Sequence, residues 1–173
     1  MSEPLTRETG LDLLRRLVAT ARVNLALYPD DLLPTLFIST AEKVEIVGLG
    51  GGMPETRAER RTVLYGLGRA YARDADWVAF VADAWIKRRH PVSEPLPPTI
   101  KGKPGTTEAI VSMWLARNGT RVMIEVPYDR VPSDGRSAAR IVFAEDHVIA
   151  EEEPTLDYDT ICATVLRGGG WRP

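Results

Sequence analysis

The pattern of hydrophobic and polar residues predicts three helices in this chain. In the first two segments, side chains that can cover apolar surface recur every three or four positions, as on one face of a helix, and the third has Asp157 and Asp159 near its start. Thr9 is placed to cap the first segment, and Thr56 with Glu59 matches the capping-box pattern near the start of the second. Gly168 is a typical stop for the third. The predicted helices cover residues 9–27, 54–75 and 155–167.

Between these helices lie shorter runs rich in β-branched and aromatic residues, which predict strands. The predicted strands cover residues 36–40, 43–47, 77–87, 108–117, 120–126, 138–144 and 148–150. Most of the links between them are short. The exception is the proline-rich stretch 90–106, a length that usually marks a functional or disordered loop. Clustered strands with short links favour an antiparallel sheet with helices packed on it, so the expected class is α+β.

The pair Asn118-Gly119 is the strongest turn signal in the chain. A two-residue turn there would place Arg117 opposite Thr120. Six apolar residues of the two strands would then share one buried face, with Trp114 half-exposed on the other. These six residues are Val111, Met113, Leu115, Val122, Ile124 and Val126.

The same reasoning for the first hairpin places Leu36 and Ile38 on one apolar face together with Val44 and Ile46. The expected organisation is one domain over residues 1–167. Gly168 to Gly170 are expected to lead into a flexible C-terminal tail over residues 168–173.

Composition and charge narrow the function classes. The chain has 173 residues, and its 44% hydrophobic and 27% charged content is ordinary for a globular domain. A net charge of −2 does not favour nucleic-acid binding. The polar N-terminal segment lacks the pattern of a signal peptide, and no apolar run is long enough to cross a membrane. We therefore expect a soluble, cytoplasmic protein.

Three acidic residues are the best candidates for a catalytic site. Asp83 interrupts an apolar strand, and a carboxylate there must be paired or must line a cavity. Glu108 opens the next strand, and Glu125 is expected opposite Ser112. If these strands are neighbours, the carboxylates can act as acid and base or hold a divalent cation. The alternative is that Asp83 pairs with an arginine.

A second candidate is an anion site. The glycines from Gly48 to Gly52 precede the second helix, as in phosphate-binding loops, but the spacing matches neither a dinucleotide fingerprint nor a P-loop. Arg57, Arg60 and Arg61 at the start of that helix can still hold an anion. With Arg69 and Arg73, they can also form an arginine face for nucleic acid. The alternative is a solvated helix surface.

The remaining chemistry-bearing residues give weaker signals. The histidines His90 and His147 are too few and too far apart to predict a metal site, and no cofactor is expected. Cys162 is expected to be a buried structural residue of the third helix. Trp171 and Arg172 at the end of the chain, with Trp114, are the predicted interface residues, because tryptophan and arginine dominate binding surfaces.

These observations favour a non-enzymatic binding or assembly protein. It would contact a protein partner or a second copy of itself, for example as a component of a larger macromolecular or phage-type assembly. Apolar residues on both faces of the strand 77–87 support this, since a sheet with two apolar faces needs cover on both sides. The first alternative is a small enzyme or ligand-binding domain that uses the three carboxylates. The second is anion or nucleic-acid binding through the arginine-rich helix.

Overall fold

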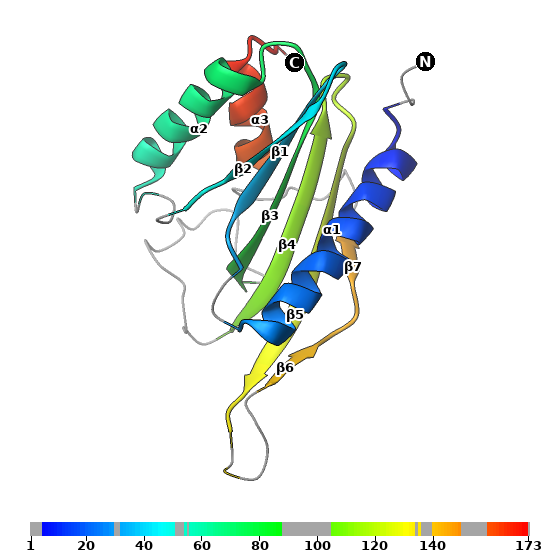
Figure 1. Ribbon diagram of the computed structural model, residues 1–173, viewed down its shortest axis with the longest axis vertical. Helices are drawn as coiled ribbons and strands as arrows, with labels where there is room; N and C mark the ends of the chain where they lie inside the picture. The colour runs from blue at the N-terminus through cyan, green and yellow to red at the C-terminus, as the bar shows by residue number, and fades with distance from the viewer. Residues whose placement is uncertain are drawn as a thin grey trace.

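The computed structural model shows one antiparallel sheet with helices on both faces (Figure 1). It describes residues 5–29, 32–50, 54, 56–87, 105–133, 135, 140–149 and 159–172. The elements in chain order are α1 (Arg7–Leu27), β1 (Thr35–Thr40), β2 (Val44–Gly48), α2 (Arg57–Tyr71), β3 (Ala75–Lys87), β4 (Thr106–Ala116), β5 (Arg121–Val131), β6 (Arg140–Phe143), β7 (His147–Ile149) and α3 (Asp159–Gly168). The predicted α+β class is therefore confirmed. None of the described helices has the length and apolar character needed to cross a membrane.

The strands follow the order β2-β1-β3-β4-β5-β6, and β7 pairs with another part of β5. All pairs are antiparallel. β2 therefore forms one edge of the sheet, and β6 and β7 share the other. The proline-rich stretch lies largely outside the described residues, as do His90 and the first part of the predicted third helix.

Local sequence explains where the first two helices begin. Thr6, not Thr9, caps α1, and its hydroxyl accepts a hydrogen bond from the Thr9 backbone N–H at 3.2 Å. Thr56 caps α2 with Glu59 as its partner, as predicted, but Glu59 bonds to the Thr56 hydroxyl. The Thr56 hydroxyl accepts from the Glu59 N–H at 3.3 Å and donates to Glu59 Oε2 at 2.7 Å.

The register predicted for the β4–β5 hairpin is wrong by one residue. The turn contains three residues, because the Ala116 N–H donates to the Thr120 carbonyl and the Gly119 N–H donates to the Ala116 carbonyl. Gly119 has a φ of +90°, as in a turn followed by a glycine bulge. Trp114 consequently pairs with Val122 rather than with Met123.

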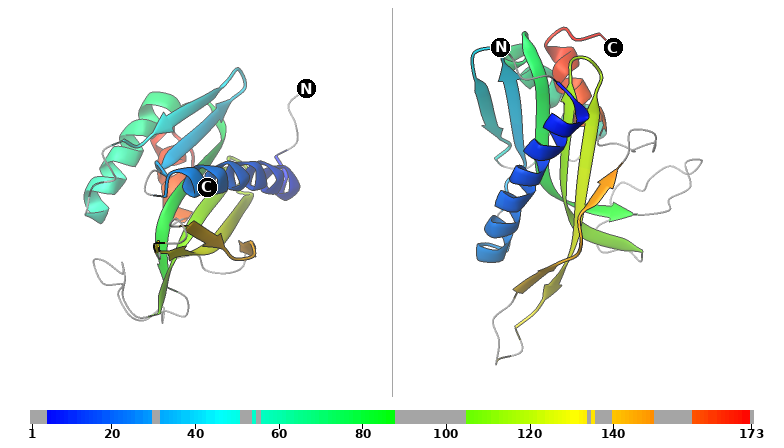
Figure 2. Two further views of the ribbon diagram at one scale, coloured as in Figure 1. Left: turned by 60° about the horizontal axis from the view of Figure 1, so that its bottom comes forward. Right: turned by 90° about the vertical axis from the view of Figure 1, so that its right-hand side faces the viewer.

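This shift divides the six predicted core residues between the two faces of the sheet. Val111, Met113 and Leu115 lie on the side of α2 and α3. Val122, Ile124 and Val126 lie on the side of α1. Both sets are buried, because α1 covers one face while α3, with α2 packed on it, covers the other (Figure 2).

Trp114 is also placed differently from the prediction. Its side chain is only 2% exposed and lies in the core beneath α1. A Cβ atom added at Gly10 would come within 2.4 Å of the indole ring, so the helix passes close over the ring. Trp114 therefore cannot serve as the predicted surface interface.

The first hairpin also differs from its predicted arrangement. Ile38 pairs with Glu45 and Phe37 pairs with Ile46. Because directly paired residues share a face, Val44 and Ile46 lie on the α1 side of the sheet and not with Leu36 and Ile38. Both are exposed.

The segment predicted as a flexible tail is packed on the body of the domain as far as Trp171. The Gly170 N–H donates to the Arg167 carbonyl, and the Trp171 N–H donates to the Leu166 carbonyl. With Gly170 at a φ of +90°, these bonds form a Schellman motif that ends α3. The Trp171 side chain packs against the core on the α3 side of the sheet. The glycines from Gly168 to Gly170 therefore end α3 and lead directly into a packed segment.

Candidate functional site

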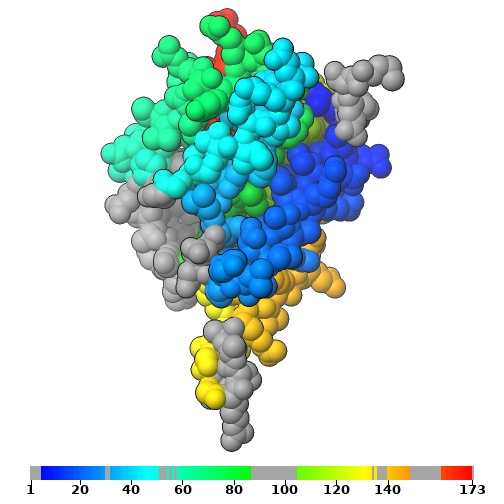
Figure 3. Space-filling model, viewed as in Figure 1, coloured from blue at the N-terminus to red at the C-terminus, as the bar shows by residue number. Residues whose placement is uncertain are grey.

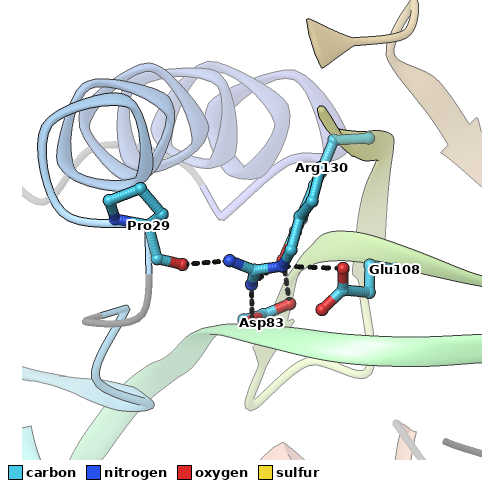
Figure 4. A network of polar contacts seen from close by, with 5 residues as sticks. Pro29, Asp83, Glu108 and Arg130 are labelled. Atoms are coloured by element: carbon cyan, nitrogen blue, oxygen red, sulfur yellow. Dashed lines mark hydrogen bonds and ion pairs between the residues drawn. The ribbon is translucent and has the colours of Figure 1, made fainter. Parts of the chain in front are cut away.

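Asp83 and Glu108, two of the three predicted carboxylates, lie together on the α1 side of the sheet (Figure 4). They belong to the neighbouring strands β3 and β4. Arg130 of β5 lies between them. Its Nε donates to Glu108 Oε2 at 2.8 Å, and its Nη2 approaches Asp83 Oδ2 at 3.4 Å.

Three further hydrogen bonds belong to this network. The Tyr128 hydroxyl donates to Asp83 Oδ1 at 2.5 Å and accepts from Arg130 Nη2 at 3.1 Å. Arg130 Nη1 donates to the Pro29 carbonyl just beyond the end of α1. The network therefore ties three strands to the segment that follows α1.

Glu125 does not join this network. It pairs with Val111 and His147, not with Ser112 as predicted, because of the one-residue shift of β5. Val111 lies on the side of α2 and α3, so Glu125 also faces that side, opposite Asp83. The three carboxylates therefore do not converge.

The charges of the network limit its chemistry. Arg130 bridges Asp83 and Glu108, so both carboxylates already accept hydrogen bonds from a guanidinium. Burial lowers the pKa of Arg130, but the hydrogen bond to Glu108 and the nearby negative charges outweigh it and raise the pKa overall. Among the described residues, no group of three or more His, Cys, Asp or Glu is placed to hold a metal ion. The arrangement is that of a cross-link between strands, as in the alternative interpretation of Asp83.

Tyr128 provides a test of this network through pH. Burial of the phenol raises its pKa well above the ordinary value of 10.0, and the hydrogen bond to Asp83 and the charge of Asp83 raise it further. When folding raises the pKa of a group, that group contributes its full stabilisation at pH values below its pKa in the unfolded chain. That contribution is lost as the pH rises from about 10 toward the folded pKa. We expect Tyr128 to make the free energy of unfolding fall above about pH 10, by at most about 1.4 kcal/mol per pH unit.

Urea unfolding between pH 8 and 11 measures this slope. Tyr128→Phe removes the ionisable hydroxyl, so its stability should fall less steeply over the alkaline range. Equal slopes in the two proteins would contradict the assignment.

A second site lies on the other side of the sheet, where a cleft of about 390 Å³ opens beside the β4–β5 turn. Three separate parts of the chain line it: the turn around Asn118, the last turns of α3, and the C-terminal segment at Trp171. The Trp171 indole N–H donates to the Arg117 carbonyl at 2.7 Å, which joins the C-terminal segment to the turn. The cleft therefore lies between two local motifs, the glycine bulge of the β4–β5 turn and the Schellman motif that ends α3.

Arginine dominates this cleft. Of the nine described residues that line it, four are arginines and none is acidic; the arginines are Arg117, Arg121, Arg167 and Arg172. Arg117 Nη2 donates to the Arg73 carbonyl at 3.2 Å, which leaves its other N–H groups for a ligand. The guanidinium groups of Arg167 and Arg172 make no hydrogen bond or ion pair to the part of the chain that the structure describes. Arg167 is also in the last turn of α3, where the helix dipole favours a cation.

The arginines predicted as an anion site lie elsewhere. Arg57 is the first residue of α2, and Arg60 and Arg61 are exposed near the same end of that helix. Figure 1 places this end away from the C-terminal segment and the β4–β5 turn. Of the predicted interface residues, Trp171 and Arg172 line the cleft.

The other reactive side chains hold no site in the described residues. Cys162 is buried in α3, as predicted. His147 is exposed in β7, opposite Glu125.

The sequence marks Trp171 and Arg172 as interface residues, but no pattern in it joins them to the other three arginines of the cleft. Arg117 and Arg121 flank the turn, and Arg167 belongs to α3 about fifty residues later. The fold alone brings them together. Comparison of the chain with protein-family models, curated proteins and solved structures finds no match.

Proposed function

We propose that this protein is a non-enzymatic binding protein that takes a small multivalent oxyanion into the arginine cleft. The observation that carries the proposal is the lining itself, because four arginines and no acidic residue stand among the described residues around this cleft. Like charges gathered around one cleft repel one another. A bound anion removes that repulsion and adds attraction.

The chemistry of arginine narrows the ligand class. Guanidinium groups bind phosphate and carboxylate oxygens through paired hydrogen bonds, which are charge-assisted and stronger than neutral ones. The cleft volume of about 390 Å³ is near the lower end of the range for small-molecule sites. The ligand class is therefore a compact molecule with two or more phosphate or carboxylate groups.

Pyrophosphate is a suitable probe for this site. We expect it to raise the melting temperature at low salt, because a ligand that binds only the folded state stabilises by about 2.7 kcal/mol at one hundred times its Kd. We also expect it to change the fluorescence of Trp171, which lines the cleft. The double substitution Arg167→Gln with Arg172→Gln should weaken binding by at least about tenfold, since one charged hydrogen bond contributes about 1.5–3 kcal/mol.

Arg60→Gln with Arg61→Gln is the matched control, because it removes the same charge from exposed positions on α2. Equal weakening in both double variants would indicate a general charge effect and would overturn the cleft as the site. Citrate in place of pyrophosphate distinguishes carboxylate from phosphate ligands. Tighter binding of a single-stranded oligonucleotide, with a steep salt dependence, would instead support the nucleic-acid alternative.

A further inference from the structure

No described residue pairs with the outer edge of β2, so within this part of the chain the strand has unpaired backbone groups at defined positions. The Thr40 N–H donates to the Lys43 carbonyl, and the Leu49 N–H donates to the Pro34 carbonyl. In an antiparallel pair, hydrogen-bonded positions alternate along the strand, so the odd-numbered residues of β2 bond to β1. The N–H and C=O groups of Val44, Ile46 and Gly48 therefore point away from the sheet.

The side chains at these positions are also uncovered. Val44 is 48% exposed and Ile46 is 66% exposed, and both lie on the α1 side of the sheet. α1 packs mainly on β4 and β5, so it does not reach this edge. Figure 3 shows the residues of β1 and β2 at the surface beside α1. Leu33 is exposed as well and lies next to Gly48.

We propose that β2 pairs with β2 of a second copy of this chain, antiparallel and with a two-fold axis at Ile46. Outward backbone groups on an edge strand are completed by another extended strand, and a two-fold axis makes the same surface serve both copies. The pairing would extend the sheet across two protomers. It shares no residue with the arginine cleft.

The register follows from the residues of β2. An axis at Ile46 pairs Val44 with Gly48 of the partner, so the whole strand is used and about six backbone hydrogen bonds form. An axis at Glu45 would place two like charges directly opposite each other, which is destabilising. An axis at Val44 would require the turn before Lys43 to be extended, and that turn is closed by the bond between Thr40 and Lys43.

Light scattering over a range of concentrations tests the association. The wild-type protein should change from the mass of one chain to that of two as concentration rises. Ile46→Lys should remain a monomer, because two lysines would meet at the axis, and its exposed position should let it fold normally. Val142→Lys is the matched control, since Val142 is 45% exposed on β6 at the other edge. A wild-type monomer at every concentration, or dimers of both variants, would overturn the proposal.

Cysteine cross-linking tests the register. Paired residues at the axis have Cα atoms about 5.5 Å apart, within the range of a disulfide. Ile46→Cys should therefore form a linked dimer under mild oxidation, whereas Glu45→Cys should link poorly because its copies would be diagonal neighbours. The native Cys162 is buried, so the wild-type protein should not cross-link and serves as the negative control. More efficient linking at position 45 than at position 46 would overturn the assigned axis.

Discussion

Gly68→Ala is expected to destabilise the protein by more than about 3 kcal/mol, in the range of strong overpacking. A Cβ atom at Gly68 would lie 2.0 Å from the Val165 carbonyl oxygen and 2.9 Å from the Gly168 Cα. Both are backbone atoms, so no side-chain rotation can relieve the clash. α2 and α3 would have to separate, and α3 is the helix that covers this face of the sheet.

Gly66→Ala is the matched control in the same helix. A Cβ atom at Gly66 would meet nothing within 4 Å. Alanine there should raise stability by up to about 1 kcal/mol, because glycine is the poorer helix former. Urea unfolding of the two variants measures both effects. If both substitutions changed stability by the same amount and in the same direction, the close packing of α2 on α3 would be contradicted.

Trp114→Ala is expected to lower the free energy of unfolding by about 3–5 kcal/mol, the usual effect of removing a large buried aromatic side chain. The indole is among the largest fully buried side chains of the protein. With the two-residue turn predicted from Asn118-Gly119, the indole would be half-exposed and its removal would have a smaller effect. The measurement therefore also tests the register of the hairpin.

Gly10 gives a second measure of the same contact. Gly10→Ala should be destabilising by itself, because its Cβ would lie 2.4 Å from the Trp114 ring. In the Trp114→Ala background, the ring is absent and the same substitution should have little effect. A double-mutant cycle by urea unfolding reports this coupling. Additive effects would show that Gly10 and Trp114 do not touch.

Part of the polar network could be predicted from the sequence. A carboxylate inside the apolar strand at Asp83 needs a partner, and the sequence predicts either neighbouring carboxylates such as Glu108 or an arginine; the structure has Glu108 and Arg130 together there. Glu125 was misplaced, because the position of every residue in β5 depends on the length of one turn. The arginine cleft could not be predicted, since its residues come from a turn, a helix and a C-terminal segment that are distant in sequence.

The sequence by itself determined the number and type of the main elements and the α+β class, because hydrophobic period and capping residues are local properties. The tertiary structure decided the registers. The Asn-Gly pair fits both a two-residue turn and a three-residue turn with a bulge. Because β4 and β5 are apolar on both faces, the alternation of apolar and polar residues does not distinguish the two registers. Packing under α1 and α3 settles which residues face each side. That packing leaves Val44 and Ile46 exposed and assembles the four arginines into one cleft.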